Sequence, residues 1–143
     1  MAVVLITGSC GLVGSESSEF FSRKGFEILG IDNNSRRNFF GKDGDINWIK
    51  NRLKKNLKNY KHFNLDITNY RDLEKIFRKY KKNIKLVIHS AAQPSHDWAK
   101  TNIFKDFDIN AKGTFFIRTE CRYHLRIGKN QTITGEKIEI YIG

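Results

Sequence analysis

Short apolar runs alternate with longer amphipathic segments along the first part of the chain. Residues 3–6 form a continuous apolar run that ends at Thr7-Gly8, a pattern typical of a strand buried on both faces of a parallel sheet. Residues 14–24 are predicted to form a helix that ends at Gly25, because glycine accepts the positive φ found at helix C-termini. Residues 26–31 are apolar again, so the start of the chain predicts a β-α-β unit.

The same alternation continues downstream. Residues 33–45 are rich in Asn, Arg, Gly and Asp and predict a long loop, with Asp45 capping the helix that follows. Residues 60–67 predict a third strand, and Thr68 or Asn69 begins the next helix. Residues 84–88 predict a fourth strand. The apolar stripes of the two helices are Ile46, Ile49, Leu53 and Leu57 in the first, and Leu73, Ile76, Phe77 and Tyr80 in the second.

The last third of the chain predicts a loop, a helix and a strand. Pro94 marks the loop, which also holds His96 and Asp97. Residues 106–123 predict a helix, whose end is expected at Gly128. Residues 137–142 alternate with a period of two and predict a fifth strand at an edge of the sheet. The candidates for the inward face of the helix are Phe107, Asn110, Ala111, Thr114 and Phe115. Strands and helices in this order predict an α/β fold, a doubly wound parallel sheet.

Composition limits the class of protein. The chain has 143 residues, about one domain, of which 39% are hydrophobic and 29% charged, which excludes a membrane-spanning or a disordered chain. The apolar N-terminal run is too short for a signal peptide, so a cytoplasmic location is expected. Cys10 and Cys121 lie far apart in sequence, which predicts two reduced thiols, with neither a disulfide framework nor a metal site.

The positive charge is concentrated in one segment. The net charge is +11, and residues 50–85 carry 13 Lys and Arg against three acids. One hypothesis is a basic module that binds RNA or another polyanion. The segment has no aromatic stacking platform and no known docking motif, which argues against nucleic acid as a partner. The simpler interpretation is that these side chains cover the solvent faces of two helices.

A glycine-rich loop lies between the first predicted strand and helix. Gly8 permits a tight turn, Gly11 lets a pyrophosphate approach the backbone, and Gly14 lets the helix pack closely on the sheet. Leu12 and Val13 complete the loop, whose free N–H groups at the helix N-terminus attract phosphates. Asp32 follows Gly14 by 18 residues, near the roughly 20 expected for an acid that binds an adenosine ribose. The pattern predicts a Rossmann-like dinucleotide-binding fold.

The residue types around Asp32 bear on the choice of cofactor. A carboxylate at this position favours NAD, because the 2′-phosphate of NADP would meet a like charge. Arg36 and Arg37 leave the choice open, since either could pair with that phosphate or with a nucleotide-linked substrate, or could lie in a solvated loop.

Three stretches carry a resemblance to a known family. They are ITGSCGLVGSE at residues 6–16, residues 30–41 with GIDN and two arginines, and LVIHSAAQPSHDWA at residues 86–99. Together they resemble the extended short-chain dehydrogenase/reductases of the NAD-dependent epimerase/dehydratase type, most of all the 2-epimerases of CDP-linked deoxysugars. The resemblance implies an NAD-binding Rossmann domain that is truncated after about four or five strands. We expect this partial domain at residues 1–125 and a divergent tail at residues 126–143.

The resemblance also implies roles for individual residues. Asp66 and Ile67 would lie beside the adenine, and Ala91, Ala92 and Gln93 beside the ribose and nicotinamide. Asn110 would lie in the helix beneath the site. His89, at the end of a buried strand, is expected to be a packing residue. The full predicted cofactor site is Gly8, Gly11, Leu12, Val13, Gly14, Asp32, Asn33, Arg36, Asp66, Ile67, Ala91, Ala92, Gln93 and Asn110.

The chain departs from the family in its catalytic residues. The family's base is the tyrosine of a Tyr-x-x-x-Lys pair, and no tyrosine of this sequence has a lysine four residues later. We therefore expect a nucleotide-sugar epimerase fragment that binds NAD and is catalytically incomplete, or a remnant without an independent role. Related enzymes form dimers, so a homodimer is a further expectation, with the phenylalanines between Phe104 and Phe116 in the core or at its interface.

Overall fold

The computed structural model describes residues 1–125 and 139–142, and it contains one parallel sheet. The strand order is β3-β2-β1-β4-β5, and every neighbouring pair is parallel. The strands are β1 (Val3–Thr7), β2 (Glu27–Ile31), β3 (Tyr60–Phe63), β4 (Ile84–His89) and β5 (Glu139–Ile142). This confirms the predicted doubly wound sheet, including a fifth strand beside β4; residues 137 and 138 of that prediction lie outside the described residues.

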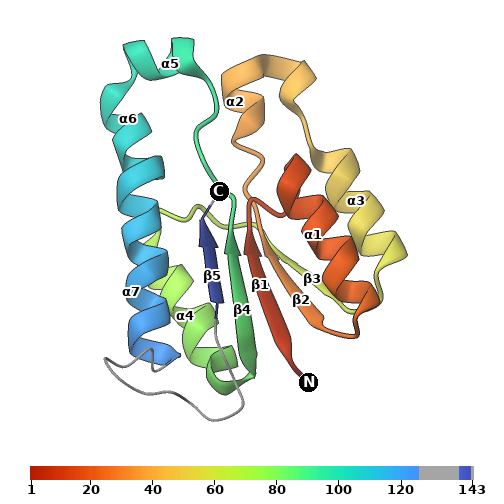
Figure 1. Ribbon diagram of the computed structural model, residues 1–143. Coiled ribbons are helices and arrows are strands. Elements are labelled where there is room, and N and C mark those ends of the chain that lie inside the picture. The colour runs from red at the N-terminus through yellow and green to blue at the C-terminus, as the bar shows by residue number, and fades with distance from the viewer. Residues whose placement is uncertain (126–138, 143) are drawn as a thin grey trace.

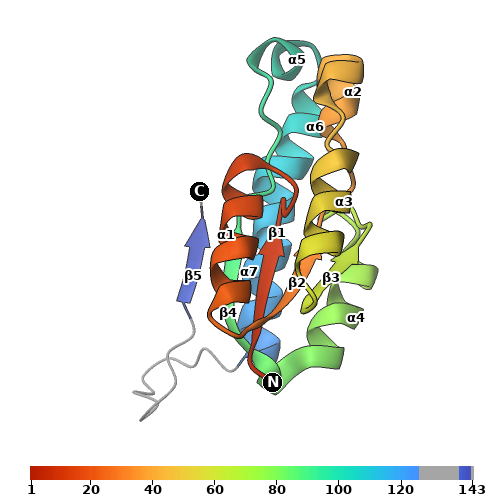
Figure 2. The same cartoon turned by 90° about the vertical axis from the view of Figure 1, so that its right-hand side faces the viewer.

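Helices cover both faces of the sheet (Figure 1). One face carries α1 (Leu12–Arg23) and α3 (Asn47–Asn56), and the other carries α4 (Tyr70–Tyr80) and α7 (Thr114–His124). Figure 2 shows α1 and α3 in front of the sheet and α7 behind it. Successive side chains of a strand point to opposite faces. Val4 and Ile6 of β1 therefore pack toward α3, whereas Val3 and Leu5 pack toward α4 and α7.

The signals at the helix ends act largely as predicted, but Asp45 is not the N-cap of α3. That position is Ile46, and the Asp45 carboxylate instead accepts the backbone N–H of Asn47, the first residue of the helix, at 2.9 Å. Asn69 caps α4 by accepting the N–H of Asp72 at 3.3 Å. Gly25 follows α1 with φ of +88°. A short 3₁₀ turn, η2 (Lys81–Asn83), leads from α4 into β4.

Three predictions about loops and strands were wrong. The predicted loop at residues 33–45 contains a helix, α2 (Arg36–Phe40), and a 3₁₀ turn, η1 (Gly41–Gly44). The third strand ends at Phe63, four residues early, because β2 ends at the register pair Ile31–Phe63 and offers no further partner. His96 and Asp97 begin a helix, α5 (His96–Thr101), since the Ser95 side chain caps it by accepting the N–H of Trp98.

The last helix is longer than predicted and is turned to a different face. It begins as α6 (Ile103–Phe107), passes through a π-helical turn, η3 (Asp108–Gly113), and continues as α7. Phe107 and Phe115 were expected to face inward, yet they are 61% and 64% exposed. Asn110 and Ala111 are exposed too, and Thr114 is half-buried. The buried positions are Ile109, Gly113, Ile117, Glu120 and Cys121.

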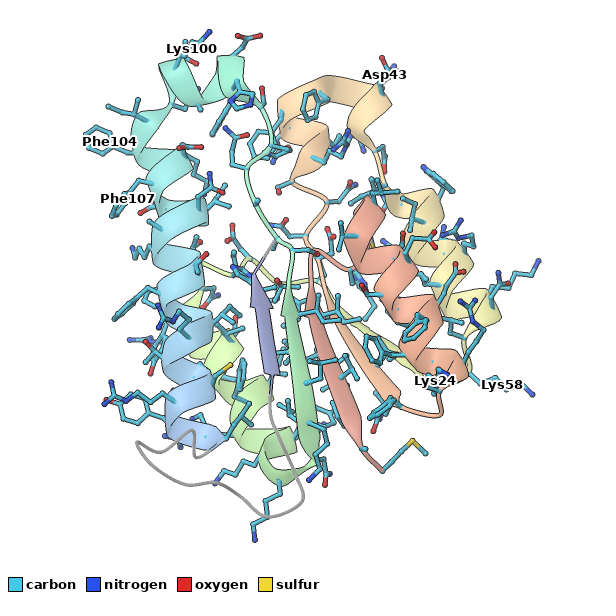
Figure 3. All side chains as sticks on the ribbon, viewed as in Figure 1. Lys24, Asp43, Lys58, Lys100, Phe104 and Phe107 are labelled. Atoms are coloured by element: carbon cyan, nitrogen blue, oxygen red, sulfur yellow. The ribbon has the colours of Figure 1, made fainter. Side chains whose placement is uncertain are left out.

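The reason for this error lies in the helix itself, which carries apolar residues on two faces. Phe104 and Phe107 project away from the sheet (Figure 3). Periodicity identifies both stripes equally well and does not show which one meets the sheet. The helix end expected at Gly128 lies outside the described residues; α7 ends at His124.

One buried carboxylate stands between α4 and α7. Glu120 is fully buried, and its carboxylate interacts with the side chains of Tyr70 on α4 and His124 on α7. Nε2 of the His124 ring lies 3.1 Å from one of the Glu120 carboxylate oxygens. Burial raises the pKa of Glu120; Tyr70, His124 and Arg78 act against this shift and Glu74 acts with it. The thiols of Cys10 and Cys121 are buried and free, as predicted.

No helix within residues 1–125 is both long enough and apolar enough to cross a lipid bilayer.

Candidate dinucleotide-binding site

The glycine loop turns sharply at the carboxyl end of β1. Gly8 has φ of +67°, and its N–H donates to the carbonyl of Ile31 at 2.8 Å. A Cβ at Gly8 would stand 2.7 Å from the backbone nitrogen of Ala91. Only glycine therefore fits between β1 and the segment after β4. The tight turn predicted at Gly8 is confirmed.

The N-terminus of α1 is open toward solvent. Gly11 is the N-cap and offers no capping side chain, and the first turn contains no acidic residue. The partial positive charge of the helix is therefore unneutralised at this end. Leu12 and Val13 in the same turn are 82% and 58% exposed, although both are large apolar side chains. The turn has the properties of a surface that an anionic ligand would cover.

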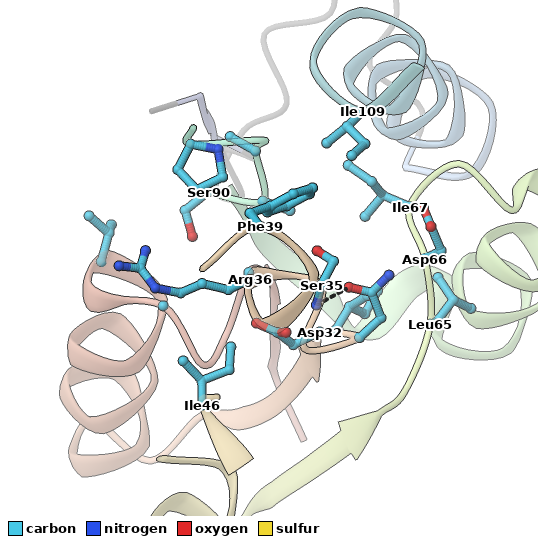
Figure 4. A pocket seen from close by; sticks show the side chains of 18 of the residues that line it. Asp32, Ser35, Arg36, Phe39, Ile46, Leu65, Asp66, Ile67, Ser90 and Ile109 are labelled. Carbon is cyan, nitrogen blue, oxygen red and sulfur yellow. Dashed lines mark hydrogen bonds between the residues drawn. The ribbon is translucent and has the colours of Figure 1, made fainter. Parts of the chain in front are cut away.

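A cavity of about 310 Å³ opens above the carboxyl ends of β1, β2 and β4 (Figure 4). The strand order changes direction between β1 and β4, which is where open α/β sheets bind ligands. Eleven of the predicted site residues line this cavity: Gly8, Gly11, Leu12, Val13, Asp32, Asn33, Arg36, Asp66, Ile67, Ala91 and Ala92. The fold thus brings together residues that are up to 84 positions apart in the sequence.

Asp32 is held in place by the backbone around it. Its Oδ2 accepts the N–H of Cys10 at 3.0 Å, and its Oδ1 accepts the N–H of Asn34 at 2.8 Å. Burial raises the pKa of this carboxyl, while the two N–H donors lower it. The Cys10 bond links the acid directly to the glycine loop. The carboxylate is therefore oriented before any ligand binds.

Three predicted residues do not line the cavity. Gly14 lies beneath the loop, where a Cβ would stand 2.0 Å from the carbonyl oxygen of Gly8. The Gln93 backbone N–H donates to Oδ1 of Asn110 at 2.9 Å, and Nδ2 of Asn110 donates to Asp106 at 2.9 Å. Gln93 and Asn110 thus tie the segment after β4 to the last helix.

The cavity also has walls that the sequence analysis did not identify. Phe39 of α2 covers it, and its ring packs edge-on against Trp98 of α5 with centroids 4.7 Å apart. Figure 1 shows α2 and α5 standing side by side above the strands. The remaining unpredicted lining residues are Ile31, Ser35, Ile46, Leu65, Ser90, Pro94 and Ile109. Leu65 and Ser90 directly precede the predicted site residues Asp66 and Ala91 in the sequence, and this position could have identified them.

The two arginines after Asp32 have different surroundings. Arg36 lines the cavity, extends toward α1 (Figure 4), and stacks on the ring of Phe40 at 4.8 Å. Arg37 points elsewhere, because its guanidinium pairs with Asp45 at 3.4 Å. Of the two, Arg36 alone is placed to meet a ligand in this cavity.

His89 is a packing residue, as predicted. Its Nδ1 is 2.6 Å from the hydroxyl of Thr7, and its Nε2 is 2.9 Å from that of Thr114. Burial lowers the pKa of His89 to about 4, so the ring is neutral at pH 7. It joins β1, β4 and α7 beneath the site.

Comparison with known proteins finds epimerases, both by family and by sequence identity. A model of the NAD dependent epimerase/dehydratase family matches residues 4–132. The chain is 36% identical over 117 residues to a UDP-glucuronate 4-epimerase of Thermodesulfobacterium geofontis, covering 80% of this chain and 33% of that protein. It is 31% identical over 121 residues to the CDP-paratose 2-epimerase of Salmonella typhi, covering 85% of this chain and 33% of that protein.

A solved structure extends the likeness to three dimensions. The Bordetella bronchiseptica enzyme WbmG, determined in complex with NAD and UDP, superposes with a TM-score of 0.61 at 28% identity. The superposition covers 82% of this chain and 33% of WbmG.

With its parallel sheet, glycine loop and cavity at the switch point of the strand order, the chain has the Rossmann-like α/β architecture. It belongs to the NAD dependent epimerase/dehydratase family, which confirms the resemblance seen in its motifs. The chain spans about a third of the length of the relatives it matches.

Proposed function

We propose that this chain binds NAD through residues 1–125 and is the dinucleotide-binding part of a nucleotide-sugar epimerase or dehydratase. The observation that carries this proposal is the open N-terminus of α1, which faces the same cavity as the oriented carboxylate of Asp32. In this proposal Gly11, Leu12 and Val13 hold the pyrophosphate, and Asp32 accepts hydrogen bonds from the adenosine ribose.

The shape of the site fits such a ligand. The backbone closes around Gly8 and Gly14 without room for a Cβ. The N–H groups of residues 8–11 donate to acceptors within the protein, so those left for a pyrophosphate belong to the first turn of α1, where they have no intrahelical acceptor. Asp66, Ile67 and Leu65 form the wall on the β3 side, where an adenine ring would lie. Ala91 and Ala92 form the wall on the β4 side, toward the nicotinamide. Bound NAD would supply hydride transfer, and these residues would bind and orient it.

The substrate class is proposed from the relatives, which are named for UDP- and CDP-linked sugars. We expect the chain as printed to be incomplete for catalysis, because no tyrosine has the lysine partner that the family uses. A phenol with the ordinary pKa of about 10 is protonated at neutral pH and is a poor base. The homodimer and the divergent tail also stay predictions.

The arrangement of charge favours this proposal over the polyanion alternative. Eight of the 13 basic residues of segment 50–85 lie on helices, four on α3 and four on α4, and these helices cover opposite faces of the sheet. Several of the basic residues are paired with acids: Arg52 with Glu19, Lys61 with Glu27, Lys75 with Asp72, and Arg78 with Glu74. A nucleic acid would therefore not meet these charges on one surface.

The test is calorimetric titration of the chain with NAD. We expect binding by the wild type and a loss of about 10- to 100-fold in affinity for Asp32→Asn, which removes a charged acceptor but keeps a similar shape. Asp72→Asn is the matched control, since it removes the same charge from an exposed site on α4. Equal NAD affinity in Asp32→Asn and Asp72→Asn would contradict the proposed ribose contact, and absence of binding by the wild type would contradict the function.

A further inference from the structure

Two short helices, α2 and α5, stand over the cavity, outside the layers of the sheet and its four packed helices (Figure 1). The ring of Phe39 on α2 lines the cavity and also packs against the apolar core on the α4 and α7 side of the sheet. Figure 4 shows this ring among the other lining side chains. A ligand in the cavity would therefore lie next to Phe39.

The segment that carries α2 is pinched at its base. Nδ2 of Asn34 donates to Oδ1 of Asp45 at 3.0 Å, and Oδ1 of Asn34 accepts the backbone N–H of Ile46 at 3.0 Å. The Arg37 guanidinium also donates to the Asp45 carboxylate, at 3.4 Å. Residues 35–44, which we name the cover loop, thus leave and rejoin the fold at one point. A loop with joined ends can turn as a unit about them.

The inside of the cover loop is closely packed. A Cβ at Gly44 would stand 2.5 Å from the carbonyl oxygen of Arg36, so η1 lies directly against α2. The Arg36 guanidinium stacks on the ring of Phe40 at 4.8 Å. Motion is therefore expected at the ends of the loop rather than within it. At the first end, Asn34 has φ of +56°, a region that asparagine adopts more readily than most residues.

An aromatic contact joins the cover loop to α5. The rings of Phe39 and Trp98 have centroids 4.7 Å apart and planes at 62°. Trp98 is held in turn by Ser95, whose side chain accepts its N–H at 3.3 Å, and Gln93 donates to the carbonyl of Ser95 at 2.9 Å. Within residues 1–125, no hydrogen bond or ion pair connects the cover loop with α5. The link between them is the packing of the two rings, which breaks at moderate cost.

We propose that the cover loop is a hinged cover of the dinucleotide cavity, and that Trp98 is the positioning residue that holds it closed through Phe39. The inference rests on the proposed function, because NAD is the ligand that the cover retains. NAD enters and leaves when Phe39 separates from Trp98 and the loop turns about Asn34. The backbone N–H of Asn34 donates to Asp32 at 2.8 Å, so the pivot adjoins the carboxylate proposed to bind the ribose.

The experiment follows NADH binding to the full chain by stopped-flow fluorescence. For wild type the observed rate should level off at high NADH concentration, because opening of the cover then limits binding. In Trp98→Ala this limiting rate and the dissociation rate should both rise about three- to tenfold while Kd stays within about threefold, since loss of the contact favours the open cover with and without ligand. Trp98→Phe keeps an aromatic partner for Phe39 and should return both rates to within about twofold of wild type.

Trp48→Ala is the matched control. It removes the same side chain from α3, where Trp48 is 62% exposed and lies outside the cavity lining, and it should bind NADH like wild type. Phe39→Leu removes the ring on the other side of the contact, keeps an apolar side chain, and should raise both rates as Trp98→Ala does.

A measurement without ligand tests the contact itself. The chain has two tryptophans, so Trp48→Phe leaves Trp98 as the sole tryptophan reporter. In this background, acrylamide should quench the emission of Trp98 more strongly after Phe39→Leu, because the ring that shields it is gone. Unchanged quenching would remove the contact on which the cover depends.

The kinetic outcomes separate the cover from the proposed function. A wild-type rate that rises linearly with NADH, equal rates in Trp98→Ala and wild type, or a Trp98→Ala variant that loses affinity without a gain in rates would each overturn the cover and leave the proposed function standing. Failure of wild type to bind NADH would overturn the proposed function and the cover with it.

Discussion

Alanine substitution at two glycines of the same loop should affect two different properties, stability at Gly14 and NAD affinity at Gly11. Gly14 is buried in the first turn of α1, and a Cβ there would stand 2.0 Å from the carbonyl oxygen of Gly8 and 2.7 Å from Cα of Ser9. Both neighbours are backbone atoms. Gly8 is itself fixed by its hydrogen bond to Ile31 and by the close approach of Ala91. The clash therefore cannot be relieved by rotating a side chain.

The magnitude follows from two opposing terms. Alanine in a helix is favoured over glycine by at most about 1 kcal/mol, which would stabilise the variant if there were room. Ordinary contact begins at 3.4 Å, so the loop and the helix would have to separate by about 1.4 Å. Overpacking of this kind costs about 1–3 kcal/mol or more. For Gly14→Ala we expect a net loss of about 1–2 kcal/mol, and a Tm lower by roughly 3–8 °C.

Gly11→Ala is the matched comparison. Its Cβ would meet only the carbonyl oxygen of Gly8, at 3.2 Å, so the fold should tolerate it with a change below about 0.5 kcal/mol. Because Gly11 lines the cavity proposed to hold the pyrophosphate, NAD affinity should fall instead. Circular dichroism melts and urea titrations measure the stability term, and calorimetry measures the affinity. A Gly14→Ala variant with an unchanged or higher Tm would refute the close packing of α1 on the loop.

Three other predictions concern stability and turnover. Burial raises the pKa of Glu120 in the folded chain, so the folded state binds this proton more tightly than the unfolded state, and the contribution of Glu120 to stability falls as pH rises above about 4.5. Urea titrations at several pH values should therefore show that the free energy of unfolding of Glu120→Gln, relative to that of wild type, rises by roughly 1–2 kcal/mol toward pH 7. A difference in unfolding free energy that does not change with pH would contradict this. Asn110→Ala should cost about 1–2 kcal/mol, because the N–H of Gln93 loses its acceptor, whereas Asn102→Ala on the exposed part of the helix junction should cost less. The chain supplied with NAD should not convert UDP-glucuronate or CDP-paratose, and product detected by chromatography would show that another residue replaces the missing Tyr-Lys pair.

The β-α-β start of the chain was predictable because each of its signals is local. The run from Val3 to Ile6 is apolar at every position, and only a strand covered on both faces buries such a run. Packing leaves no room for a Cβ at Gly8 and Gly14, and Gly8 and Gly25 have a positive φ that favours glycine. The distance from the glycine loop to Asp32 follows from the length of one helix and one strand. Most of the candidate site was therefore visible in the sequence.

The predictions from sequence were wrong where the buried face of a helix or the end of a strand depended on contacts between segments that are distant in the sequence. The last helix has two apolar faces, and only the sheet determined that Ile109 and Ile117, rather than Phe107 and Phe115, turn inward. The third strand stopped at Phe63 because its neighbour stopped at Ile31. The short helix α2 is too brief to show a period.

By itself, then, the sequence determined the order of the five strands along the chain, the glycine loop and the acid at position 32, because these depend on the chemistry of neighbouring residues. The tertiary structure alone decided which surfaces came together. It placed Phe39 over the cavity against Trp98, set Glu120 between two helices, and brought Lys50 and Lys54 beside His62. Such contacts depend on how helices and strands pack, and no local pattern in the chain encodes them separately.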